Sequence, residues 1–168
     1  SLTVSGVSLL DADVTTSGTQ TYSAAITLGT AARTLQGTTV QTTTINGAQN
    51  LTITGILDLN GAIGASTRVG VFSVSGASNL GANVLSNGTQ TYTGAVTLSA
   101  DITLTSSDDQ FTFSSTVQSD GTARDLTLNS GTATIGITGA IGGNSKPLDV
   151  LTITQSGGVT FSGAINAD

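Results

Sequence analysis

Apolar and polar residues alternate along most of this chain, in short runs separated by glycine, asparagine and aspartate. The run Leu51–Thr54, for example, places apolar side chains at every second position, which is the period of a half-buried β-strand. Turn-forming pairs lie between such runs, as at Asn46-Gly47 and Asn87-Gly88. The pattern predicts an all-β protein built from short strands.

A five-residue motif recurs within this pattern: an apolar residue, three small residues and a β-branched residue. It starts at Tyr92, Phe113, Ile137 and Phe161, which are almost evenly spaced, and at Tyr22 in the first half. We therefore predict a parallel β-solenoid (β-helix) with coils of about 20–24 residues, since such a period is typical of one coil. Its core contains one column of side chains, formed by Tyr22, Tyr92, Phe113, Ile137 and Phe161.

A longer repeat overlies the short one. Residues 2–28 return as residues 72–98 with 15 of 27 positions identical, and a related tetrad appears again at 151–154. We interpret residues 1–168 as one continuous repeat domain, with repeat 1 at about 2–71, repeat 2 at about 72–150 and a partial third repeat at 151–168. We expect the chain to be a fragment of a longer polypeptide.

A tandem β-sandwich is the alternative fold. It needs about seven strands in about 100 residues, commonly around a bulky buried Trp. This chain has no Trp, its long repeat is shorter than such a domain, and a coil-length period exists within it. These observations favour the solenoid.

Composition narrows the range of functions. Only Arg33, Arg68, Arg124 and Lys146 are basic and the net charge is −6, whereas nucleic acids and anionic membranes attract basic clusters. No apolar run reaches the roughly 18–20 residues of a membrane-spanning helix. We expect no nucleic-acid partner and no direct membrane insertion.

Two repeated sequence elements indicate a family. Residues 18–28 and 88–98 share Gly-Thr-Gln-Thr-Tyr followed by an Ala-Ile/Val-Thr-Leu strand, and Gly-Ala-Ile-Gly occurs at 61–64 and 139–142. They resemble the β-strand repeats of large bacterial surface proteins, the filamentous-haemagglutinin-like and autotransporter-like adhesins. The resemblance implies a secreted protein on the bacterial surface or in the extracellular matrix. It also implies a structural or adhesive role, in a stiff stalk or fibre that associates with neighbouring repeats or other copies.

Candidate chemistry is sparse. There is no His, Cys or Glu, so acid–base catalysis would fall to Asp pairs, Asp108 with Asp109 or Asp11 with Asp13, as in enzymes that act on polysaccharides. The turn carboxylates Asp108 and Asp109 are also weak candidates for Ca²⁺. Solvated turn residues explain both sets more simply. We expect no enzymatic activity and no cofactor, and keep a glycan- or matrix-binding face as the alternative function.

Overall fold

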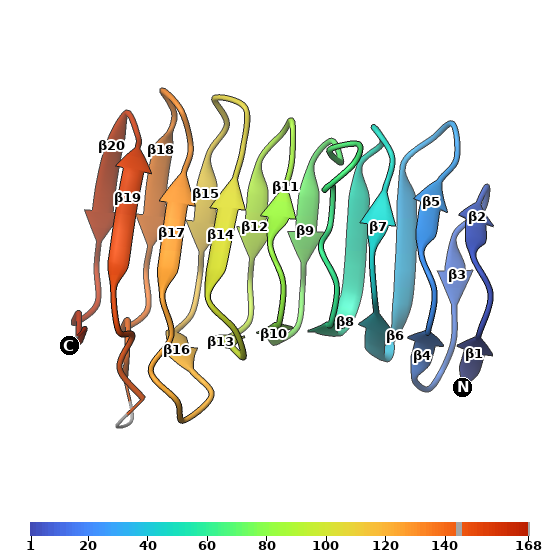
Figure 1. Ribbon diagram of the computed structural model, residues 1–168, viewed down its shortest axis with the longest axis horizontal. Helices are drawn as coiled ribbons and strands as arrows, with labels where there is room; N and C mark the ends of the chain where they lie inside the picture. The colour runs from blue at the N-terminus through green and yellow to red at the C-terminus, as the bar shows by residue number, and fades with distance from the viewer. Residues whose placement is uncertain (144–145, 168) are drawn as a thin grey trace.

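A computed structural model describes residues 1–143 and 146–167. Within these residues the chain forms strands, turns and connecting segments with no helix, and the strands pair in parallel in about eight stacked turns. The predicted all-β parallel solenoid is therefore confirmed. Figure 1 shows the turns side by side along one axis, with the two ends of the chain at opposite ends of the rod.

Each turn contributes to three faces, which are defined by their strands. Face 1 holds β1 (Leu2–Val4), β4 (Gln20–Tyr22), the second parts of β6 (Arg33–Thr42) and β8 (Leu51–Leu59), β10 (Ser78–Leu80), β13 (Val96–Leu98) and β16 (Val117–Ser119). Face 2 holds β2 (Ser8–Leu10), β5 (Ile26–Leu28), β7 (Ile45–Asn46), β11 (Val84–Leu85), β14 (Ile102–Thr105), β17 (Leu126–Asn129) and β19 (Leu151–Gln155). Face 3 holds β3 (Val14–Thr15), the first parts of β6 and β8, β9 (Phe72–Val74), β12 (Gln90–Tyr92), β15 (Phe111–Phe113), β18 (Thr134–Ile137) and β20 (Gly158–Phe161).

The turns differ in length. Paired residues are 17 positions apart at Val40 and Leu57 but 24 apart at Val117 and Ile141, and 26 apart at Asn129 and Gln155, after a register shift. This range is wider than the predicted period, because the connections between strands differ in length and the longest spacing includes an irregularity within the β17–β19 pair.

Alternate residues of each strand face a single apolar core. In β15, for example, Phe111 and Phe113 are buried while Thr112 between them is partly exposed. The same alternation of buried and exposed residues holds on all three faces, as expected for strands with one solvent-exposed side. The core therefore runs along the axis as columns of stacked side chains.

Glycine forms a column at the corner between faces 3 and 1. Its members include Gly37, Gly55, Gly76 and Gly94, each in a successive turn. A Cβ on Gly94 would overlap the backbone of Gly76, and one on Gly76 would overlap that of Gly55. Glycine is needed here because consecutive turns approach backbone to backbone.

Candidate assembly site at the C-terminal turn

Four of the five predicted column residues share one register on face 3. Tyr92 pairs with Phe113, Phe113 with Ile137, and Ile137 with Phe161. The Tyr92 and Phe113 rings are stacked, with centroids 5.1 Å apart and planes 5° from parallel. The first three side chains are buried, whereas Phe161 in the last turn is 38% exposed.

Tyr22 lies elsewhere, and its assignment to this column was wrong. It is buried, but on face 1, where it pairs with Val4 and Thr42. The reason is that the long repeat is not a whole number of turns. Ile63 occupies a strand position on face 2, where single bridges join it to Ile45 and Val84. With Ile63 included, β9 lies eleven strand positions after β1, which is three and two-thirds turns, so each repeat starts on a different face.

The third repeat continues this rotation. Leu2 begins on face 1, Phe72 on face 3 and Leu151 on face 2. The interval from Phe72 to Leu151 is longer in sequence than that from Leu2 to Phe72, but it spans the same number of strand positions, eleven, when Ile141, which is bridged to Val117 on face 1, is included. The extra residues therefore lie in the connections and do not alter the stacking.

Each tyrosine belongs to a local polar cluster that sequence reasoning missed. Tyr92 Oη donates to Gln90 Oε1 (2.9 Å), and Gln90 Nε2 donates to the carbonyls of Val84 (3.2 Å) and Thr105 (2.9 Å) and to Ser86 Oγ (3.1 Å). Burial raises the pKa of the Tyr92 hydroxyl well above its usual range. The repeated Gln-Thr-Tyr was the signal for this buried glutamine.

The first repeat forms the same cluster on another face. Tyr22 Oη donates to Gln20 Oε1 (3.0 Å), and Gln20 Nε2 donates to the carbonyls of Val14 (3.0 Å) and Gln36 (2.6 Å). Gln20 is fully buried, and burial raises the pKa of Tyr22. The local sequence Gln-Thr-Tyr thus forms this cluster on face 1 as well as on face 3.

Two of the four candidate carboxylates, Asp108 and Asp13, bond to the next turn. Asp108 Oδ1 accepts hydrogen bonds from the N–H (2.8 Å) and hydroxyl (3.2 Å) of Thr132, and Asp13 Oδ1 accepts from the N–H of Thr34 (2.8 Å). Among residues 1–143 and 146–167, no group of three or more His, Cys, Asp or Glu side chains is placed to hold a metal ion. Asp108 and Asp13 therefore link successive turns.

An ion pair occupies another corner, between β16 and β17. Arg124 Nη2 lies 3.1 Å from Asp120 Oδ2, and this guanidinium lowers the pKa of the Asp120 carboxyl. Both side chains are partly exposed, so the pair is screened by solvent.

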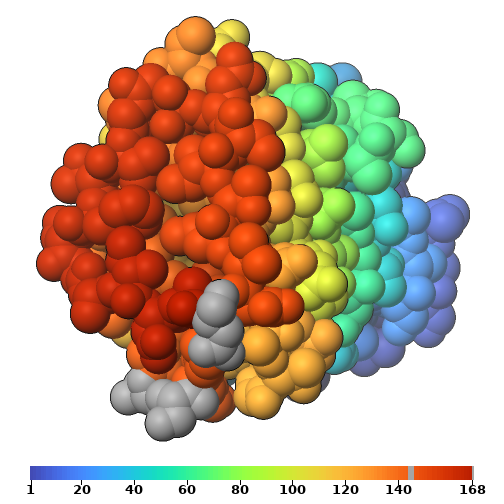
Figure 2. Space-filling model, turned by 60° about the vertical axis from the view of Figure 1, so that its left-hand side comes forward, coloured from blue at the N-terminus to red at the C-terminus, as the bar shows by residue number. Residues whose placement is uncertain are grey.

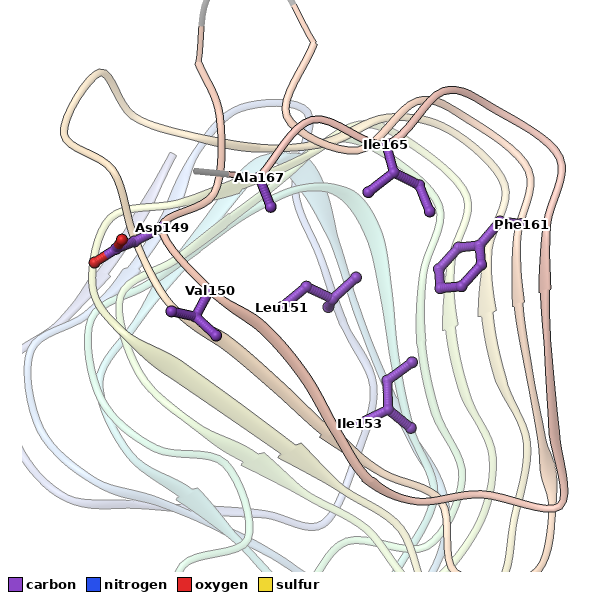
Figure 3. A pocket seen from close by; sticks show the side chains of 7 residues that line it. All are labelled: Asp149, Val150, Leu151, Ile153, Phe161, Ile165 and Ala167. Carbon is purple, nitrogen blue, oxygen red and sulfur yellow. The ribbon is translucent and has the colours of Figure 1, made fainter.

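A concave apolar surface lies at the C-terminal end of the rod. Figure 2 turns this end toward the viewer, and Figure 3 shows Leu151, Ile153, Phe161 and Ile165 pointing toward one another inside the last turn. Its lining residues are Asp149, Val150, Leu151, Ile153, Phe161, Ile165 and Ala167. Within the described residues, β19 and β20 pair on one side only, so each leaves a strand edge free.

The N-terminal turn presents the matching surface. Leu2, Val4 and Val14 pack against the core from one side and are only partly buried, and Leu10 is 7% exposed. Strands β1, β2 and β3 likewise pair on one side only in the part of the chain that the structure describes. Both ends of the rod thus carry core side chains and unpaired backbone groups, which is the arrangement found between turns.

Comparison with known proteins gives no relative: no family model, no curated protein and no solved structure matches this chain. Among the residues described, no helix is long and apolar enough to cross a membrane.

Proposed function

We propose that this chain is a structural segment of a secreted bacterial surface protein, in which it forms part of a stiff extracellular stalk or fibre. The observation that carries the proposal is the axial continuity of the fold: the ladder of face 3 runs unbroken from β3 to β20, and the apolar core runs beside it through about eight turns. The resemblance of its repeats to those of large adhesins supports the setting at the cell surface.

The geometry suits a spacer. Turns spaced by about 4.8 Å give a rod of roughly 38 Å for eight turns. In such a fold each repeat contacts only its neighbours, so further repeats add length without changing those in place. A longer array therefore holds an attached domain farther from its anchor.

Single-molecule force spectroscopy tests the role. The chain is placed between two marker domains and pulled by its ends. A turn of about 17–26 residues releases about 6–9 nm of contour at ~3.3–3.6 Å per residue. We expect discrete rupture events that each release one or more whole turns, and we expect Phe113→Ala to rupture at lower force. Smooth extension without such events would overturn the mechanical role.

A second function is favoured by the outer side of face 3. Hydroxyl side chains lie in register there, one per turn, as Thr34, Thr52, Ser73, Thr91 and Thr112. A column of donors and acceptors with a regular spacing suits an extended polysaccharide. Binding of the isolated chain on a glycan array, lost in Thr91→Val, would support a glycan-binding face; no binding above background would exclude it.

A further inference from the structure

We infer that the C-terminal turn binds the N-terminal turn of a second copy, rotated by one third of a turn, so that Leu2–Val4 of the incoming copy extends the sheet beyond Leu151–Ile153. This inference rests on the proposed function, because it assigns a partner to the strand edges that β19 and β20 leave unpaired within the described residues. It is argued from an interface that the molecule already contains.

The C-terminal turn repeats an internal one. Residues 51–54 and 151–154 are both Leu-Thr-Ile-Thr, and Gly-Ala-Ile follows at 61–63 and 163–165. Both segments run over three consecutive strand positions: faces 3, 1 and 2 for the first, and faces 2, 3 and 1 for the second. The surface formed by β19, β20 and Ile165 is therefore a rotated copy of a surface that is covered inside the rod.

Residues 72–84 cover that internal surface. Phe72 and Val74 lie in register with Leu51 and Ile53, Ser78 and Leu80 with Leu57 and Leu59, and Val84 with Ile63. Residues 2–14 are the repeat equivalent of 72–84 and share 7 of 13 positions with it. The N-terminal turn of this protein thus carries the sequence that covers such a surface.

The rotation follows from the helical path. Each strand stacks on the strand three positions earlier, and the last strand position of the described residues, at Ile165, lies on face 1. The next position along this path is on face 2, above β19. A copy stacked without rotation would place β1 above Ile165 on face 1 and leave two strand positions empty, with their backbone groups unpaired, which is costly when they are buried.

The side chains match in the rotated arrangement. Inward-facing residues of the incoming copy meet inward-facing residues of the C-terminal turn, as Leu2 on Leu151, Val4 on Ile153, Leu10 on Phe161 and Val14 on Ile165. The one polar residue in the set is Ser8, which meets Val159. An equivalent contact exists within the rod, where Ser78 is buried between Leu57 and Val96.

Engineered disulfides test the rotation directly, because the chain has no cysteine of its own. Paired residues on neighbouring strands lie about 4.8 Å apart, within the Cα range of a disulfide. Thr3 faces outward between Leu2 and Val4; Thr152, Thr160 and Asn166 are its counterparts on faces 2, 3 and 1. Three double variants therefore report the three possible rotations: Thr3→Cys with Thr152→Cys, Thr160→Cys or Asn166→Cys.

We expect the Thr3→Cys/Thr152→Cys variant to form a ladder of dimers and higher oligomers on oxidation, at least tenfold above either single-cysteine variant. Thr52→Cys/Ser73→Cys, an in-register pair within one chain, is the positive control for the chemistry. A ladder no stronger than that of the single variants, or an equal ladder from either other pair, would overturn the inference.

Association of the cysteine-free protein gives an independent measurement. Phe161→Asp and Ile165→Asp, both at the exposed end, should remove concentration-dependent oligomers in sedimentation velocity. Ile56→Asp is the matched control, since Ile56 is 45% exposed in the middle of the rod, and should leave them intact. A wild-type monomer at every concentration would overturn end-to-end stacking. The force measurement on a single chain would be unaffected, so the two failures are distinguishable.

Discussion

Phe113 is the central test of the core assignment. Its side chain is 1% exposed, lies between Tyr92 and Ile137 in the face 3 column, and is 6.5 Å by ring centroid from Phe111. Truncating a buried Phe to Ala costs about 3–5 kcal/mol, through lost apolar burial and the cavity that remains. The stacked Tyr92 ring loses its partner in the same change.

Phe161 provides a matched control. It occupies the same column at the exposed end of the rod, where solvent can fill the space that truncation leaves. Phe161→Ala should cost less than half as much as Phe113→Ala. At about 2–4 °C per kcal/mol for a chain of this size, the midpoint of Phe113→Ala should fall by roughly 6–20 °C.

The assay is thermal and urea unfolding of the wild type and both variants, followed by far-ultraviolet circular dichroism. The measurement is made at low protein concentration, so that association does not contribute. If Phe113→Ala loses no more stability than Phe161→Ala, the column does not carry the packing energy that the structure assigns to it.

Three further predictions concern the polar cluster and the corner. Because burial raises the pKa of Tyr92 in the folded state, its contribution to stability is complete below the unfolded pKa of about 10 and is lost as pH rises above it; Tyr92→Phe should flatten the decline in urea midpoint above that pH, and an unchanged slope would contradict this. Gln90→Leu leaves the buried Tyr92 hydroxyl without its acceptor and should lower the free energy of unfolding by about 1–3 kcal/mol. The double variant Gln90→Leu/Tyr92→Phe should lose less stability than the sum of the two single variants; strict additivity in this double-mutant cycle would show that the two side chains are not coupled. Gly94→Ala should lower the melting temperature because its Cβ meets the Gly76 backbone, whereas Gly6→Ala, with open space around it, should not; equal melting temperatures would refute the close approach at this corner.

The solenoid could be predicted because the features that produce it recur along the amino-acid sequence. Apolar residues at strand spacing, small residues at corners and a period near one turn all follow from stacking short strands. The column from Tyr92 to Phe161 could be located because each interval between its successive members corresponds to one turn.

The place of Tyr22 could not be predicted, because the length of the long repeat does not say how many strands it contains. Gln-Thr-Tyr is compatible with any face, since the cluster around Gln20 or Gln90 is completed by backbone carbonyls, which every face offers. The candidate assembly site was equally hidden: Leu151 and Phe161 look like ordinary core residues, and only the stacked structure shows them uncovered on one side.

The interval of three and two-thirds turns between long repeats has a consequence for any array built from them. A feature borne once per repeat reappears one third of the circumference away and about 18 Å further along the axis, at ~4.8 Å per turn. Three repeats, eleven turns in all, bring it back to the same side after roughly 53 Å. Such an array has no front or back: it bends no more readily in one direction than another, and it offers the same chemistry to partners approaching from every side.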